Sequence, residues 1–339
     1  MIAAHTYTLT ALTDIWTGDA SGKPGRLIHT GLLGSIRWWF EVLVRGLGGS
    51  ACDPSNTQAR CPDRQGRRCV VCELFGCTGW ARKFRLDVLG SGGTTQKDQI
   101  KAGKTFELRF TPLRPIAQEE WTLLDVTIRL IADYGAIGGK TVYKPTEETS
   151  RLPEQHHQDL GLVKLVSSTP GRRFHEEELR RYVSLPEWRE LTQKDFAWAS
   201  LQHFWCVLGR HLSREGLGRS SFNRVLGRHE SKECRDCGKV HDPPLRCPET
   251  GKHPRRHSDQ SPTADCEKWL AGGRAESKKV FSFKNPARTF GFVNPGTITF
   301  GEMLARLKGV WDLNDGEFIF IRGGDILDRL LGSGAGGTL

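Results

Sequence analysis

The spacing of apolar residues in the first part of the chain predicts a strand, a helix, two strands, a helix and a strand, in that order. Residues 6–12 alternate polar and apolar side chains, which is the two-residue period of a half-buried strand. From Thr30 onward the apolar residues recur at the spacing of one helical face. The further elements are expected at residues 83–89 and 105–111 (strands), 118–133 (helix) and 141–143 (strand).

The helix that begins near Thr30 has two distinct faces. Its apolar face carries Leu32, Leu33, Ile36, Trp39, Phe40, Leu43, Val44 and Leu47. Its opposite face carries Gly34, Arg37, Trp38, Glu41 and Arg45. A tryptophan outside the apolar face can stack on a base or contact a partner subunit, with the adjacent arginines assisting. The alternative is that another part of the same chain covers Trp38.

The same order of elements is expected again beyond a polar stretch at residues 145–159. The second set comprises a strand at 161–167, a helix at 195–212, two short strands within 280–293, a helix at 300–308 and a strand at 317–321. A β-α-β-β-α-β order is typical of the ferredoxin-like fold, an antiparallel sheet with both helices on one face. We therefore predict an α+β protein with two ferredoxin-like domains in tandem, at residues 1–150 and 151–339.

The charge balance favours a polyanionic partner. The chain has 49 Lys and Arg against 39 Asp and Glu, a formal net charge of +10. Each phosphate that a basic side chain neutralises releases condensed counterions, which favours nucleic-acid binding. The sequence contains no apolar run of the roughly 18 residues that a membrane span requires. Since the first residues also lack the pattern of a secretion signal, we expect a cytoplasmic protein without a membrane partner.

Ten cysteines in a cytoplasmic chain are more typical of metal sites or buried thiols than of disulfides. Nine of them gather in two polar segments, at about residues 50–80 and 230–270, each after the first helix of a predicted domain, and the tenth, Cys206, lies within the helix predicted at residues 195–212. Two-residue gaps at Cys69–Cys72 and Cys234–Cys237 suit tetrahedral Zn²⁺. We predict up to two structural zinc ions, because a metal would stabilise segments with few core residues.

The predicted zinc ligands are Cys52, Cys61, Cys69, Cys72, Cys234, Cys237, Cys247 and Cys266. Which residue completes each site stays open, with Cys77, His241, His253 and His257 as the options. The alternative is that all of these cysteines are free thiols.

Three segments carry distinctive motifs, at residues 16–18 (WTG), 30–41 (TGLLGSIRWWFE) and 69–82 (CVVCELFGCTGWAR). They resemble the RAMP superfamily, and more narrowly the first-numbered RAMP subunit of the type III-B CRISPR effector, the Cmr complex. Residues 134–141 (YGAIGGKT) resemble the glycine-rich loop of the superfamily. The resemblance implies two ferredoxin-like folds and an RNA-binding subunit that holds the 3′ region of CRISPR RNA, helps to capture target RNA and contacts other RAMP subunits. It also implies that a different subunit cleaves the target.

RNA contacts are expected at the start of the first helix, along its polar face, after the first cysteine segment and at the glycine-rich loop. Backbone N–H groups at a helix start and in a glycine-rich loop can bind phosphate. The bland alternative for the loop is a tight turn whose glycines only relieve strain. The candidates are Arg26, His29, Arg37, Trp38, Arg45, Arg82, Lys83, Gly138, Gly139, Lys140, Thr141, Tyr143 and Lys144.

Two other functions fit the same sequence. His29 could be the general base of a metal-independent CRISPR-RNA processing endoribonuclease, although no Tyr or Lys close to it in sequence is the evident second group. A structural capping subunit without direct RNA contact is the other. We expect a non-catalytic, RNA-binding protein.

Overall fold

The computed structural model describes residues 4–17, 25–53, 56, 60–138, 159–169, 175–191, 196–212, 221–227, 265–272, 277–313 and 317–332. These residues form two compact units. The first unit contains the described residues up to Cys206 and those from Ile321 onward, and the second contains those between Val207 and Phe320. None of the described helices is long and apolar enough to cross a membrane.

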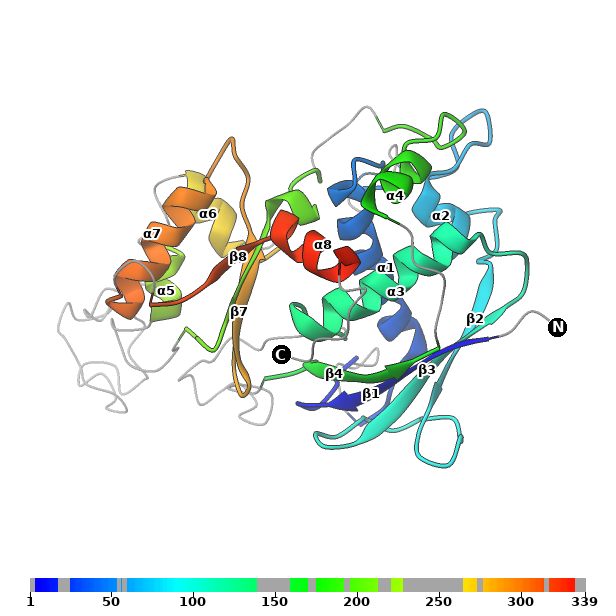
Figure 1. Ribbon diagram of the computed structural model, residues 1–339, viewed down its shortest axis with the longest axis horizontal. Helices are drawn as coiled ribbons and strands as arrows, with labels where there is room; N and C mark the ends of the chain where they lie inside the picture. Colours follow the sequence, from blue (N-terminus) through cyan, green and yellow to red (C-terminus); the bar gives the residue numbers. More distant parts are fainter. Residues whose placement is uncertain are drawn as a thin grey trace, which may run out of the picture. The chain divides into compact units, whose positions relative to one another are not determined.

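The first unit contains a four-stranded antiparallel sheet (Figure 1). Its strands are β1 (His5–Ala11), β2 (Phe84–Leu89), β3 (Thr105–Pro112) and β4 (Val163–Ser168). They lie in the order β2-β3-β1-β4, with Tyr7 opposite Leu108 in the central pair. The register of β1 with β4 shifts between Thr8 and Leu9. The strands predicted at residues 6–12, 83–89, 105–111 and 161–167 are confirmed.

Two long helices, α1 (His29–Gly46) and α3 (Gln118–Asp133), lie against one face of this sheet (Figure 1). Side chains on alternate strand positions point toward them, so Tyr7 and Leu9 are buried while Thr8 is not. The apolar stripe of α1 is buried as its spacing predicted, except at Leu33, and Glu41 from the predicted polar face is buried as well. At the start of α3, the carboxylate of Glu120 accepts the N–H of Ala117 at 2.8 Å.

Shorter helices complete the first unit: α2 (Val70–Phe75), α4 (Glu176–Val183), a 3₁₀ turn at Leu201–His203 and α8 (Gly323–Gly332). Two glycines allow close packing around Leu201. A Cβ at Gly46 would lie 2.5 Å from the Cβ of Leu201, and a Cβ at Gly323 would clash with the Leu201 carbonyl. These close approaches hold α1 and α8 against the turn.

A second four-stranded sheet has the order β6-β7-β5-β8. It comprises β5 (Phe204–Leu208), β6 (Val280–Lys284), β7 (Ala287–Phe292) and β8 (Phe320–Arg322). In the chain, α5 (Ser221–Val225) and α6 (Asp265–Ala271) lie between β5 and β6, and α7 (Phe300–Trp311) lies between β7 and β8. In both sheets the second, third, first and fourth strands of the set lie side by side in that order. The predicted pair of strands within 280–293 and the helix near 300–308 are confirmed.

Two predictions for the second half are wrong. Residues 195–212 do not form a helix: their described part contains the 3₁₀ turn and the strand β5, whose first four residues are all buried. The strand expected to open the second half is β4, which pairs with β1 and closes the first sheet. The second cysteine-rich segment therefore follows a strand and a short helix, not a long helix. The strand expected at residues 141–143 lies outside the described residues.

Candidate metal centre and nucleic-acid interface

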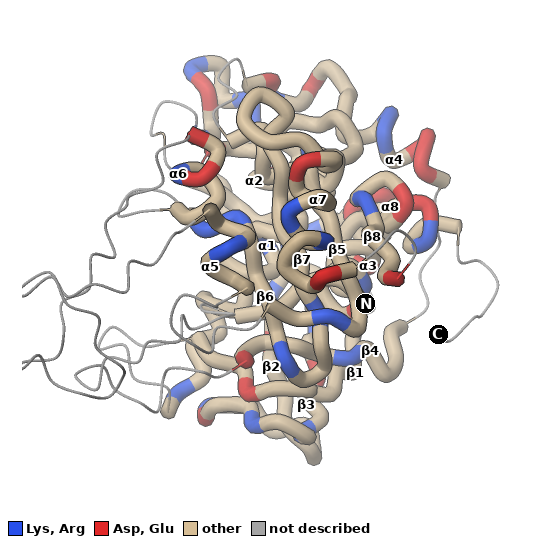
Figure 2. Tube along the Cα trace, turned by 90° about the vertical axis from the view of Figure 1, so that its left-hand side faces the viewer, with Lys and Arg blue, Asp and Glu red and all other residues tan. Residues whose placement is uncertain are grey.

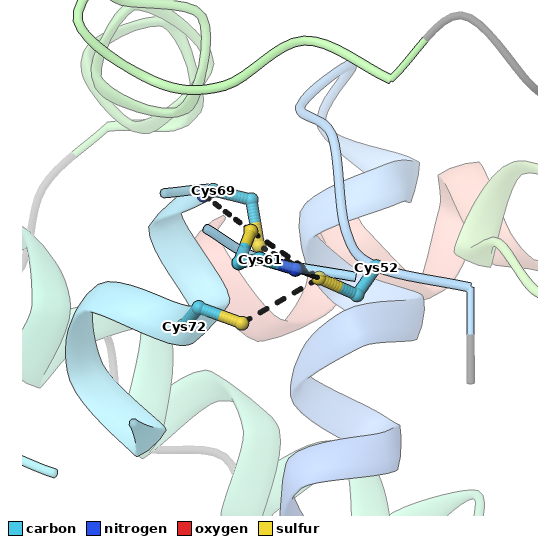
Figure 3. A group of neighbouring side chains, drawn as sticks. All are labelled: Cys52, Cys61, Cys69 and Cys72. Atoms are coloured by element: carbon cyan, nitrogen blue, oxygen red, sulfur yellow. Dashed lines mark hydrogen bonds between the residues drawn. The ribbon is translucent and has the colours of Figure 1, made fainter. Parts of the chain in front are cut away.

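Four cysteine side chains converge in the first unit (Figure 3). The sulfur atoms of Cys52, Cys61, Cys69 and Cys72 all lie within 4.8 Å of one another, and all four residues are buried. The Sγ atom of Cys52 lies 3.3 Å from that of Cys61, 3.9 Å from that of Cys69 and 3.5 Å from that of Cys72. These distances exceed the roughly 2.0 Å of a disulfide. The four predicted ligands of the first segment thus form one group that could hold a metal ion.

The geometry fits tetrahedral zinc. A Zn–S distance of about 2.3 Å places the sulfur atoms of a tetrahedral site about 3.8 Å apart. The 3.3–3.9 Å separations around Cys52 are close to that value. Four thiolates leave no open position for a substrate, so the site suits a structural metal and not a catalytic one.

The local fold brings these ligands together from three short stretches. Cys52 lies shortly after the end of α1, Cys69 is the N-cap of α2, and Cys72 lies in the first turn of α2. Backbone groups support the sulfur atoms, since the N–H of Cys61 donates to Cys52 Sγ and the N–H of Cys69 donates to Cys61 Sγ, each at 3.2 Å. Cys77 lies outside the group, with its thiol directed to the carbonyl of Thr78 at 3.8 Å.

Three predicted RNA contacts have side chains that bond to other parts of the protein, and among them Arg37 keeps 28% of its side chain exposed. Arg45 is 9% exposed, and its guanidinium donates to the carbonyls of Ala199 and Cys52 at 3.0 and 2.8 Å. Arg37 donates to Cys72 Sγ and to the carbonyl of Gly76. These hydrogen bonds oppose a direct role of either arginine in RNA binding.

Lys83 is the third of these residues. Its ammonium lies 3.0 Å from the carboxylates of Glu73 and Glu120 and is 13% exposed. Burial raises the pKa of Glu120, and the charge of Lys83 opposes that shift. The triad joins α2, α3 and the residue before β2, so its ion pairs oppose a direct role of Lys83 in phosphate binding.

Four exposed basic residues lie on the segment before α1 and on the β2–β3 connection that runs beside it. Leu27 donates its N–H to the carbonyl of Lys97 at 2.8 Å, and the backbone of Arg26 pairs with that of Asp98 in an isolated antiparallel β-bridge, so the chain before α1 runs beside the β2–β3 connection. The exposed side chains of Arg26, Lys97, Lys101 and Lys104 belong to these two segments. We call these four residues the α1 patch.

The α1 patch has a surplus of positive charge. Its four basic residues are accompanied by Asp14, which pairs with Lys101 at 2.9 Å, and by Asp98. Figure 2 shows basic and acidic residues spread along the trace. Sequence reasoning found Arg26 but missed the three lysines, although their 97, 101 and 104 spacing in a polar connection was a visible signal.

The described part of the glycine-rich loop packs against α1. The N–H groups of Gly135, Ile137 and Gly138 donate to the carbonyl of Leu130, the carbonyl of Gly161 and the hydroxyl of Ser35. Up to Gly138, the described loop therefore does not direct these N–H groups toward a phosphate. In this part of the loop the geometry is that of a tight turn, the alternative given above. The reason is that tertiary packing uses the donors that the sequence alone leaves open.

His29 lies half-buried at the first position of α1. Its Nε2 atom is 2.7 Å from the carbonyl oxygen of Gln96. Because a carbonyl can only accept, Nε2 carries the proton and only Nδ1 could act as a base.

Two further candidates lie near the surface. Arg82 is half-buried at the start of the segment leading into β2. Trp38 is half-buried, and its ring meets that of Trp39 edge-on at 4.9 Å. Both keep part of their surface accessible to a partner.

Several predicted residues fall outside the described part of the chain. These are Gly139, Lys140, Thr141, Tyr143, Lys144, Cys234, Cys237, Cys247, His241, His253 and His257. Cys266 is described: it lies half-buried on α6, and its Sγ accepts from Arg306 at 3.5 Å. The second predicted zinc site stays a prediction.

Comparison with known proteins connects the first part of the chain to one family. Residues 8–143 match the model of the RAMP superfamily. No curated protein matches the chain. The match spans β1 to the glycine-rich loop and includes the four clustered cysteines.

Three solved structures show a weak likeness. The crystal structure of Cmr1 from Pyrococcus furiosus in its apo form is 10% identical, with 98% of this chain and 97% of that chain covered and a TM-score of 0.39. A chain of the type III-B Cmr-beta complex bound to cognate target RNA is 11% identical, with 91% and 99% covered and a TM-score of 0.46. A chain of the type III-A Csm3–Csm4 subcomplex is 16% identical, with 53% and 93% covered and a TM-score of 0.23. With TM-scores this low, these likenesses establish neither fold nor function.

Proposed function

We propose, from the premise that residues 8–143 belong to the RAMP superfamily, that this protein is a non-catalytic, RNA-binding subunit of a type III-B CRISPR ribonucleoprotein effector. Its ligands are CRISPR RNA, target RNA or both, and its protein partners are other RAMP subunits in the cytoplasm. The family match is the observation that carries the proposal. The net charge of +10 supports it, because a polyanionic partner would neutralise that surplus.

The two sheets support a tandem ferredoxin-like architecture. Each has the strand order that results when a β-α-β-β-α-β unit places its first strand between the third and fourth. The first unit follows the order β1-α1-β2-β3-α3-β4, with α2 inserted in the cysteine segment. In the chain the second sheet begins with β5, and in this proposal the first cysteine segment is an insertion after α1.

The α1 patch is the surface that we assign to the RNA backbone. Its exposed lysines and Arg26 offer point charges and a guanidinium without a fixed base-reading geometry, which suits phosphate contact. The first turn of α1 contains no acidic residue, and its N-cap Ile28 offers no capping side chain. The helix dipole therefore adds to the positive potential there.

The test measures RNA binding by the assembled complex at several salt concentrations. The slope of log K against log[salt] is negative, and each phosphate contact on a single strand contributes about 0.7 to its magnitude. Replacing Lys97, Lys101 and Lys104 together by Gln should therefore reduce that magnitude by about 2. The matched control replaces Arg67, Arg85 and Arg181, three other basic residues that lie outside the patch, by Gln. An unchanged slope in the lysine variant, or an equal loss in the control, would remove the patch from the RNA surface.

The non-catalytic part of the proposal has its own test. Purified protein without divalent metal should leave single-stranded RNA intact, because no Tyr or Lys close to His29 in sequence offers the second group that would protonate the leaving oxygen. Cleavage at a defined position that His29→Ala abolished would replace our proposal with the endoribonuclease. Cross-linking within the complex that found no RNA on this subunit would favour the structural capping role.

We further propose that Cys52, Cys61, Cys69 and Cys72 bind one structural Zn²⁺. Elemental analysis of freshly purified protein should find at least one zinc per chain. Cys72→Ser should lose one equivalent. Cys206→Ser is the control, because Cys206 is buried outside the group, with its thiol 3.8 Å from the carbonyl of Tyr134. Equal zinc in wild type and Cys72→Ser would contradict the site.

A further inference from the structure

Helix α1 presents two arginines and a glutamate to the cysteine group. Arg37, Glu41 and Arg45 are spaced four residues apart and so follow one another along the same face of the helix. Arg37 donates to Cys72 Sγ at 3.1 Å. A second nitrogen of the same guanidinium donates at 2.8 Å to the carbonyl of Gly76, the residue after the end of α2. Arg37 thus holds both a thiol and the helix that carries it.

Arg45 holds the other end of the cysteine group. It donates to the carbonyl of Cys52 at 2.8 Å and to that of Ala51 at 3.4 Å. A third hydrogen bond, to the carbonyl of Ala199, fixes the guanidinium from the opposite direction. The backbone that presents the Cys52 sulfur is therefore fixed by a buried side chain of α1.

Glu41 aligns the two arginines. Its carboxylate lies 3.0 Å from Nε of Arg37 and 3.9 Å from Arg45, and its side chain is 7% exposed. A buried carboxylate is costly unless it is paired, so its position between two guanidinium groups offsets that cost. The three charged groups form one connected network that ends on the thiol of one ligand and the backbone of another.

We propose that Arg37, Glu41 and Arg45 form a positioning network for the metal centre, with Arg37 as the residue that tunes it. Four thiolates around a divalent ion carry a net charge of −2, and a guanidinium N–H on one sulfur compensates part of it. Hydrogen bonds from such outer residues orient ligands and typically change metal affinity by about 10- to 100-fold. This inference rests on the proposed zinc site. It reassigns two arginines that the sequence placed on an RNA-binding face.

The test measures zinc affinity by competition with a chromophoric chelator on the full-length protein. Arg37→Gln should weaken zinc binding by about 10- to 100-fold. Arg37→Lys keeps the charge but loses the forked geometry, so its zinc affinity should lie between those of wild type and Arg37→Gln. Arg67→Gln is the matched control. Arg67 belongs to the same cysteine segment but pairs with Asp63 at 2.9 Å, and its replacement should leave the affinity unchanged.

A second measurement separates metal positioning from ordinary helix packing. With Co²⁺ in place of Zn²⁺, the thiolate-to-metal absorption band should shift in Arg37→Gln and stay unchanged in Arg67→Gln. Wild-type affinity and an unshifted band in Arg37→Gln, with equal destabilisation of metal-free and metal-loaded protein, would reduce Arg37 to a packing residue. A wild-type protein that binds neither ion would instead overturn the zinc site itself.

Discussion

Trp39 shows how one side chain decides what its neighbours can do. Its indole Nε1–H donates to the carbonyl of Ala136 at 2.8 Å, and its ring meets that of Phe204 edge-on at 5.7 Å. Gly135 lies so close that a Cβ there would be 2.6 Å from the ring. The start of the glycine-rich loop is thus shaped by an aromatic side chain of α1.

Gly135→Ala should therefore destabilise the protein. The new methyl group would overlap the ring of Trp39, and overpacking of this kind costs about 1–3 kcal/mol. Denaturant unfolding measures the change. Gly34→Ala is the control, because a Cβ at Gly34 meets nothing within 4 Å and alanine favours a helix by about 1 kcal/mol over glycine. A neutral Gly135→Ala would show that the packing there is slack.

His5 makes the stability of the first unit depend on pH. It stacks on Trp121 with ring centroids 3.8 Å apart, and burial lowers its pKa below 6.5 while Asp125 acts in the opposite direction. The unfolded chain then binds the proton more readily than the folded one, so this stabilisation is complete above pH 6.5 and is lost as the pH falls through the lowered pKa. His5→Phe keeps the stack and should flatten this part of the profile in unfolding measurements between about pH 5 and 7.5. A profile as steep as that of wild type would assign the dependence to other groups.

At the scale of elements, α1 combines two tasks along its length. Its start borders the α1 patch, and the face that carries Arg37 and Arg45 meets the cysteine group. The apolar stripe between them fixes the helix on the sheet. Both the proposed RNA surface and the proposed metal site therefore involve the same 18-residue helix.

The apolar face of α1 should dominate its contribution to stability. Leu43 is fully buried, so Leu43→Ala should cost about 2–5 kcal/mol. Trp38 is half-buried, and Trp38→Ala should cost less while weakening assembly or RNA retention. Thermal unfolding and complex reconstitution measure the two effects. An equal loss of stability in both variants would make Trp38 a core residue.

The start of α7 gives a local test in the second unit. The hydroxyl of Thr299 accepts the N–H of Glu302 at 3.3 Å, and the carboxylate of Glu302 accepts the N–H of Thr299 at 2.7 Å. This reciprocal capping predicts a loss of about 0.5–2 kcal/mol for Thr299→Ala in chemical denaturation. Thr299→Ser keeps the hydroxyl and should stay close to wild type. If the serine variant lost as much, the cap would not be the cause.

At the scale of the whole molecule, the cysteine group belongs to the first unit, and a metal bound there should govern the stability of that unit. Its ligands lie in a segment with short helices, and a structural metal contributes folding free energy. A strong chelator should lower the first unfolding transition of the wild type. In Cys72→Ser protein the first unfolding transition should already occur at the lower temperature, and the chelator should not change it. A chelator response that persisted in Cys72→Ser would locate the metal elsewhere.

The sequence by itself determined the elements whose periodicity is local. The bounds of α3 and the apolar stripe of α1 follow from residue spacing, because one buried face imposes its period on the chain. The four cysteines of the first segment were equally readable, since a metal site needs particular residue types at short separations. The boundary expected at residue 150 lies outside the described residues and stays a prediction.

Only the tertiary structure decided which apolar run becomes a strand and where each charge points. Residues 204–207 are apolar at every position, and such a run carries no period that separates a buried strand from a helix. The partner of β4 is β1, a strand far away in the chain, so local spacing could not identify it. Arg37, Arg45 and Lys83 look like solvent-facing charges in sequence. Their donors are instead satisfied by a thiol, backbone carbonyls and two carboxylates, all brought close by packing.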